Sequence, residues 1–99
     1  MKTSELTGNA LNWAVNYAEG LRGIFAPVDY SGDWAQGGPI IDREKISLVD
    51  ANGCWAGRKA YWDSPKPSLL LYGPTPLIAA MRCYVASKLG DDVDVPELP

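Results

Sequence analysis

The sequence contains no histidine, and this absence is its most informative feature. It excludes Ser-His and Cys-His nucleophile pairs, a histidine general base and histidine metal ligands. Only two cysteines occur, and on their own they make a poor zinc site. The glycine spacings of Walker and Rossmann phosphate loops are missing too, so we expect no metal and no cofactor. Enzymes without histidine exist, so the absence argues against catalysis without closing the question.

Long apolar runs and a strong positive charge are also missing. No apolar stretch approaches the ~20 residues that cross a bilayer, and the polar N-terminus does not resemble a signal peptide. The 9 basic and 12 acidic residues give a net charge of -3, which does not favour a nucleic-acid binder. A reducing compartment would keep both cysteines as thiols. We therefore expect a protein that stays in the cytoplasm and binds neither membranes nor nucleic acid.

Length and composition are those of one globular domain. The 99 residues, 46% hydrophobic and 21% charged, predict a single domain over residues 1–99. Helical and strand patterns both occur, so the predicted class is α+β. We expect two main helices, at about 4–19 and 76–89, packed on a small and mainly antiparallel sheet.

The first predicted helix begins after a capping hydroxyl at Thr3 or Ser4. Gly8 weakens its first turn, so a later start with Thr7 as the cap is the alternative. One broad face is apolar and is expected to lie in the core. It consists of Leu6, Ala10, Trp13, Ala14, Tyr17 and Ala18.

The second predicted helix has clearer ends. Thr75 caps it, Pro76 takes the first position and Gly90 closes it. One side is a stripe of large apolar residues and the opposite side is small residues, which predicts burial on two sides. The covering element is a sheet, a helix or a second subunit, so self-association stays open.

The segments between the helices predict short strands and loops. Residues 45–49 alternate and, through an Asn52–Gly53 turn, pair with a strand that begins at Cys54. The run 69–72 fits a strand or buried coil. We expect a strand at 21–28, a loop at 30–39, and a short strand at Ile40–Ile41. Residues 91–95 read as an edge strand or an extended tail.

The candidate binding residues combine aromatic, amide, hydroxyl and cationic side chains with glycines. They are Trp34, Gln36, Gly37, Gly38, Trp55, Thr75 and Arg82. An indole and an amide beside flexible backbone can stack on a ring and hydrogen-bond its edge. The alternative for Trp34 is a lid on the core. For Arg82 it is an ion pair with Asp33 or Asp42 or a snorkelling side chain, and for Thr75 a simple cap.

Three functions remain open from these residues. The first is an interaction protein that binds another protein through an aromatic surface around Trp34 and Trp55. The second is a binder of a small aromatic or anionic ligand, such as a nucleotide, with Arg82 as the anion partner. The third is an enzyme that uses carboxylates, with candidates Asp33, Asp42 and Glu44. We assign no catalytic residue.

Four segments of the sequence resemble the NinX-like family of small proteins from lambdoid phages and prophages. They are Ser4-Glu5-Leu6-Thr7-Gly8, Leu11-Asn12-Trp13-Ala14-Val15, residues 33–41 (DWAQGGPII) and residues 73–82 (GPTPLIAAMR). The resemblance runs from the N-terminus to Gly90 and into the valine tail. It implies a phage or prophage origin, the bacterial host cytoplasm and an accessory role. It carries no catalytic residue over to this chain.

Overall fold

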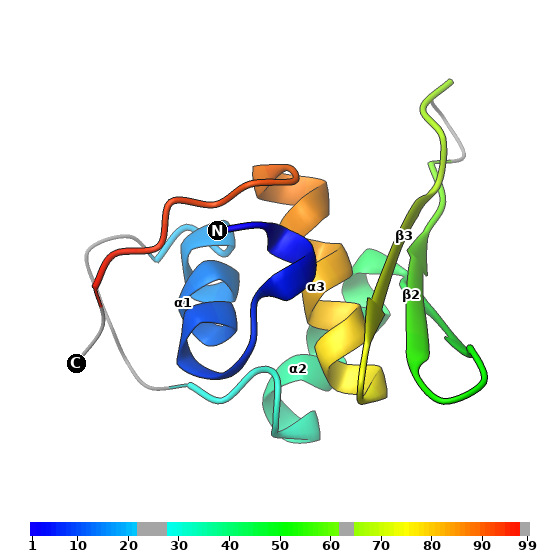
Figure 1. Ribbon diagram of the computed structural model, residues 1–99, viewed down its shortest axis with the longest axis horizontal. Coiled ribbons are helices and arrows are strands. Elements are labelled where there is room, and N and C mark those ends of the chain that lie inside the picture. Colours follow the sequence, from blue (N-terminus) through cyan, green and yellow to red (C-terminus); the bar gives the residue numbers. More distant parts are fainter. Residues whose placement is uncertain (22–27, 62–64, 98–99) are drawn as a thin grey trace.

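The computed structural model describes residues 1–21, 28–61 and 65–97. Its elements, in chain order, are η1 (Thr3–Glu5), α1 (Gly8–Ala18), α2 (Trp34–Glu44), β1 (Ser47–Asp50), β2 (Trp55–Lys59), β3 (Leu69–Gly73) and α3 (Pro76–Leu89). Figure 1 shows α3 in the middle of the molecule, with α1 on one side and the strands on the other. The helix α2 also packs on α3. The predicted α+β class is confirmed.

The three strands form an antiparallel sheet in the order β1-β2-β3. The β1–β2 turn forms where it was predicted. Asn52 and Gly53 have φ values of 59° and 107°, and the Asp50 carboxylate accepts a hydrogen bond from the Asn52 N–H at 3.0 Å. The run 69–72, which fitted a strand or buried coil, is strand β3.

The helix α3 has the ends that the sequence predicts. The Thr75 hydroxyl oxygen accepts from the Ile78 N–H at 3.1 Å, and Gly90 ends the helix with a φ of 88°. Burial on two sides is confirmed, because α3 contacts the sheet as well as α1 and α2. The first helix begins later than Ser4. Thr7 is extended and Gly8 has a φ of 55°, so the chain breaks between η1 and α1.

The helix α2 corrects the predicted loop at 30–39 and the predicted strand at Ile40–Ile41. Its start is stabilised by Asp33, whose carboxylate accepts from the Ala35 N–H at 3.0 Å. Ile40 is buried in the core on the inner side of the helix. Pro39 is tolerated on the exposed side. Tertiary burial of one face therefore outweighs the low helix propensity of glycine and proline.

Two other predicted segments are the strand at 21–28 and the tail after α3. The predicted strand at 21–28 falls largely on residues 22–27, which lie outside the described residues. The tail after α3 is extended rather than an edge strand of the sheet. It forms one isolated antiparallel bridge, between Lys2 and Asp92, so it pairs with the N-terminus.

The sheet and α3 approach each other most closely at Ala79. A Cβ atom added to Gly57 would lie 2.7 Å from the Ala79 carbonyl oxygen, and one added to Gly73 would lie 2.7 Å from the Ala79 nitrogen. Ala79 itself is fully buried. The small residues on this side of α3 therefore allow its backbone to lie almost directly on β2 and β3.

A polar network joins the C-terminal ends of α1 and α2 to the middle of α3 and to β2. The Arg43 guanidinium donates to both Glu19 oxygens, at 3.1 and 2.8 Å, and through Nε to Glu44 at 2.9 Å. The Tyr84 hydroxyl donates to Glu19 at 2.6 Å, and Lys59 Nζ donates to the Glu44 carboxylate at 3.0 Å. The network therefore connects α1, α2, β2 and α3 around the buried Tyr84.

The substitution Gly57→Ala tests the close approach at Ala79. The added methyl group meets backbone atoms that cannot rotate away, so we expect a loss of about 1–3 kcal/mol in the free energy of unfolding. Gly38→Ala is the matched control. Its Cβ would have only an ordinary contact, 3.8 Å from Trp34, and alanine favours a helix by about 0.5–1 kcal/mol. Urea unfolding measures both, and equal effects would contradict the packing argument.

The polar network predicts an acid-sensitive stability. Burial alone raises the pKa of Glu19, but hydrogen bonds from Arg43 and Tyr84 outweigh it, so the pKa lies below 4.5. The pKa of Glu44 is lowered in the same way, because hydrogen bonds from Lys59 and Arg43 outweigh its burial. A carboxylate whose pKa is lowered by folding stabilises the fold at pH values above its pKa in the unfolded chain. This stabilisation is lost as the pH falls through the pKa of the folded state.

We therefore expect the free energy of unfolding to decline between about pH 5 and about pH 2, as followed by urea titration. The free energy of unfolding of the Glu19→Gln variant should decline less over this range, because one of the two carboxylates no longer titrates. An identical pH dependence in wild type and variant would show that Glu19 does not contribute.

Candidate functional site

The exposed side of α2 carries an open hollow of about 440 Å³. Trp34, the first residue of the helix, is 54% exposed and forms one wall. The other lining residues follow at helical spacing and continue into β1. The lining set is Trp34, Gly38, Ile41, Asp42, Lys45, Ile46 and Ser47, and we call it the Trp34 hollow.

The Trp34 hollow combines an aromatic wall, two isoleucines and two charges of opposite sign. The indole lies along the helix over Gly38, where an added Cβ would be 3.8 Å from its Cε3 atom. Asp42 and Lys45 are both exposed. These groups suit the recognition of an apolar side chain with polar neighbours. They do not bring a nucleophile and a base together.

Gly37 and Thr75 have local structural contacts, and Gln36 lies outside the Trp34 hollow. Gly37 is buried, and a Cβ there would clash with the Tyr30 carbonyl oxygen and lie 2.7 Å from Leu77, so this glycine allows α2 to pack closely on its neighbours. Gln36 is exposed but is not part of the Trp34 hollow. The Thr75 hydroxyl oxygen caps α3 by accepting from Ile78.

Arg82 lies at the opposite edge of the sheet from the Trp34 hollow. Its Nε donates to the Leu6 carbonyl at 2.7 Å and its Nη1 to the Tyr72 carbonyl at 2.8 Å. Burial lowers its pKa from the ordinary value. Tyr72 belongs to β3, whereas the hollow reaches β1, so the structure does not bring Arg82 and Trp34 together. The guanidinium bonds backbone carbonyls, so the alternative of an ion pair with Asp33 or Asp42 is wrong.

Trp55 is the first residue of β2 and is partly buried. Strand alternation places it on the same face as Gly57, which contacts α3. It is not one of the residues that line the Trp34 hollow. The two tryptophans therefore do not share that hollow.

The carboxylates and thiols considered for chemistry have separate environments. Asp33 caps α2, Glu44 pairs with Lys59 and Arg43, and Asp42 is exposed at the Trp34 hollow. Cys83 is buried, and burial raises the pKa of its thiol to about 11. In the described ranges, no three Cys, Asp or Glu side chains are placed to hold a metal ion.

The outer face of the sheet is a surface that the sequence reasoning missed. Register and alternation place Val49, Ala56 and Tyr72 in one row across the strands, with Leu70 on the same face. Val49, Leu70 and Tyr72 are 53%, 48% and 50% exposed, and Ala56 is buried between its neighbours. We call these four residues the outer sheet face.

A signal for the outer sheet face exists in the sequence. The run 69–72 is apolar at every position, and such a run predicts a strand with apolar residues on both faces. Only one of these faces is covered by α3. The other face is therefore an exposed apolar patch, which is typical of an interaction site.

Arg82→Leu tests whether Arg82 is a structural residue. The variant leaves the Leu6 and Tyr72 carbonyls without their donors, so we expect a loss of about 1–3 kcal/mol in the free energy of unfolding. Arg82→Lys should lose less, because an ammonium can still donate to one carbonyl. Thermal and urea unfolding measure both, and full stability of the leucine variant would disprove the structural role.

Comparison with known families identifies the family of the chain. The family model described as Bacteriophage P22, NinX matches residues 23–88, which is more than half of the chain. The match includes α2 and all of α3 except Leu89, and with them two of the four segments that carried the resemblance. Among curated proteins, none matches the chain significantly. No helix in the described residues is long and apolar enough to cross a membrane. The chain belongs to the phage NinX family, and it is a phage accessory protein.

Proposed function

We propose that the protein binds a host or phage protein in the host cytoplasm through the outer sheet face and the Trp34 hollow. The observation that supports this most directly is the half exposure of Val49, Leu70 and Tyr72 on the outer sheet face. Water contact with three large apolar side chains on one plane is unfavourable, and a partner surface would remove it. Aromatic residues are frequent anchors in such contacts.

The two surfaces meet at β1. Ser47 lines the Trp34 hollow, and register places it beside Arg58 and Leu70 on the outer side of the sheet. A partner that covers the sheet therefore has the indole of Trp34 within reach of the same edge. Tyr72 and Trp34 would supply rigid contact area, and Arg58 would supply a charge at the rim.

The small-ligand alternative has less support from the geometry. The Trp34 hollow offers an indole for stacking, but its cation is Lys45 rather than the predicted Arg82. An exposed lysine holds a phosphate less specifically than a bidentate arginine. Thermal unfolding with a nucleotide panel separates the two functions, because only a ligand binder gains stability.

Pull-down from phage-infected host cells tests the proposed interaction. The double variant Val49→Thr/Tyr72→Thr keeps strand propensity and removes the apolar surface. Trp34→Ala removes the indole. We expect each to lose a protein that wild type captures, while the free energy of unfolding changes by only about 0.5 kcal/mol per exposed site.

Leu21→Ser is the matched control for this experiment. Leu21 is also an exposed large apolar residue, but it follows α1 and lies outside both surfaces. The Leu21→Ser variant should capture the same proteins as wild type. If the surface variants also capture the wild-type set, the proposed interaction surface is wrong.

A further inference from the structure

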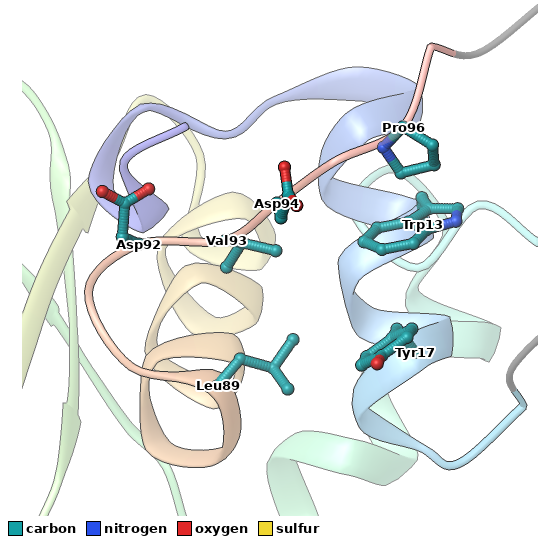
Figure 2. A pocket seen from close by; sticks show the side chains of 7 residues that line it. All are labelled: Trp13, Tyr17, Leu89, Asp92, Val93, Asp94 and Pro96. Atoms are coloured by element: carbon teal, nitrogen blue, oxygen red, sulfur yellow. The ribbon is translucent and has the colours of Figure 1, made fainter.

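A second surface depression lies between α1 and the segment that follows α3. It has a volume of about 410 Å³, within the range of roughly 300–1,000 Å³ that is usual for ligand sites. Its lining residues, drawn in Figure 2, are Trp13, Tyr17, Leu89, Asp92, Val93, Asp94 and Pro96. We call it the tail groove. It shares no residue with the Trp34 hollow or the outer sheet face.

One wall of the tail groove is an aromatic pair. Trp13 and Tyr17 are one helical turn apart on α1, and their rings stack with centroids 5.1 Å apart and an interplanar angle of 27°. Both were expected in the core, yet both are only partly buried. Figure 2 shows Leu89 and Val93 pointing across the gap toward this pair. The groove is therefore apolar on both sides.

The opposite wall is held in place by the N-terminus. The Val93 N–H donates to the Met1 carbonyl at 2.8 Å, and the Met1 amino group donates to the Val93 carbonyl at 2.8 Å. The Thr3 N–H donates to the Asp91 carbonyl, also at 2.8 Å. Val93 is buried under this pairing. The wall is thus formed before any ligand arrives, which lowers the entropic cost of binding.

The charged side chains among the described residues that line the tail groove are negative. Apart from Tyr17, the ionisable residues of this described lining are Asp92 and Asp94, and none of its residues is a lysine or arginine. Asp92 is 3.2 Å from the Met1 amino group. Asp94 is exposed and has no ion-pair partner within the described part of the chain. The groove therefore favours a cation and disfavours an anion.

We propose that the tail groove binds an arginine side chain from an apolar segment of a partner protein. A guanidinium stacks on a tryptophan ring, here that of Trp13, and can donate to a carboxylate at the same time. The methylene stem would lie along Leu89 and Val93, while Asp94 receives the charge. This site is separate from the proposed protein-binding surface, so either can fail without the other.

Titration of the full-length protein with acetyl-Leu-Arg-Leu-amide, followed by NMR, tests the proposal. We expect shifts in the Trp13 indole N–H and in the Leu89 and Val93 methyl signals, but none from the neutral peptide acetyl-Leu-Gln-Leu-amide. Asp94→Asn should weaken binding about two- to fivefold, as for an exposed ion pair. Trp13→Leu, read on the methyl signals, should weaken it by a similar factor through the lost ring.

Asp42→Asn is the matched control, because it removes the same charge from the Trp34 hollow and should leave the affinity unchanged. The proposal is overturned by equal binding of the glutamine peptide, by equal weakening in both asparagine variants, or by unshifted groove signals at millimolar peptide. Trp34→Ala should bind the arginine peptide like wild type, which separates this site from the proposed interaction surface.

Discussion

The contact between α3 and the sheet at Ala79 is the constraint on which the rest of the structure depends. Gly57 and Gly73 leave no side chain between the strands and the helix, so backbone meets backbone on both sides of Ala79. This position of α3 leaves its remaining sides for α1 and α2. Because α3 is mostly buried and contacts every other described helix and strand, the other elements are placed by reference to it.

The same contact explains why the outer sheet face is uncovered. A small domain has few elements with which to cover both faces of a sheet, and here the helices gather around α3 on one side. Val49, Leu70 and Tyr72 are left half exposed as a result. Exposed apolar area of this kind costs free energy until a partner covers it, which connects the packing of the core to the proposed interaction.

The polar groups of the structure are used for holding elements together. Arg43 pairs with Glu19 and Glu44, Arg82 bonds two backbone carbonyls, and Asp33 and Thr75 cap helices. In the described chain, no buried side-chain nitrogen or oxygen lacks a hydrogen-bond partner. The open surfaces, by contrast, combine aromatic and aliphatic side chains with charges at their rims. This division of roles supports recognition as the basis of the proposed function.

The sequence by itself determined the elements whose signals are local. Thr75, Pro76 and Gly90 set the ends of α3, the Asn52–Gly53 pair set the β1–β2 turn, and the segments at 33–41 and 73–82 indicated the family. These signals depend on backbone preferences of a few neighbouring residues, so they can be read without the fold.

Only the tertiary structure decided the outcome where several elements compete. Two glycines and a proline favoured a loop over residues 30–39, yet burial of Ile40 and the close fit of Gly37 against Leu77 made α2 a helix. Arg82 found carbonyls of Leu6 and Tyr72 that are distant in sequence. Which side of an apolar strand is covered, and which tryptophan stays exposed, depends on contacts between distant segments. No local pattern carries that information.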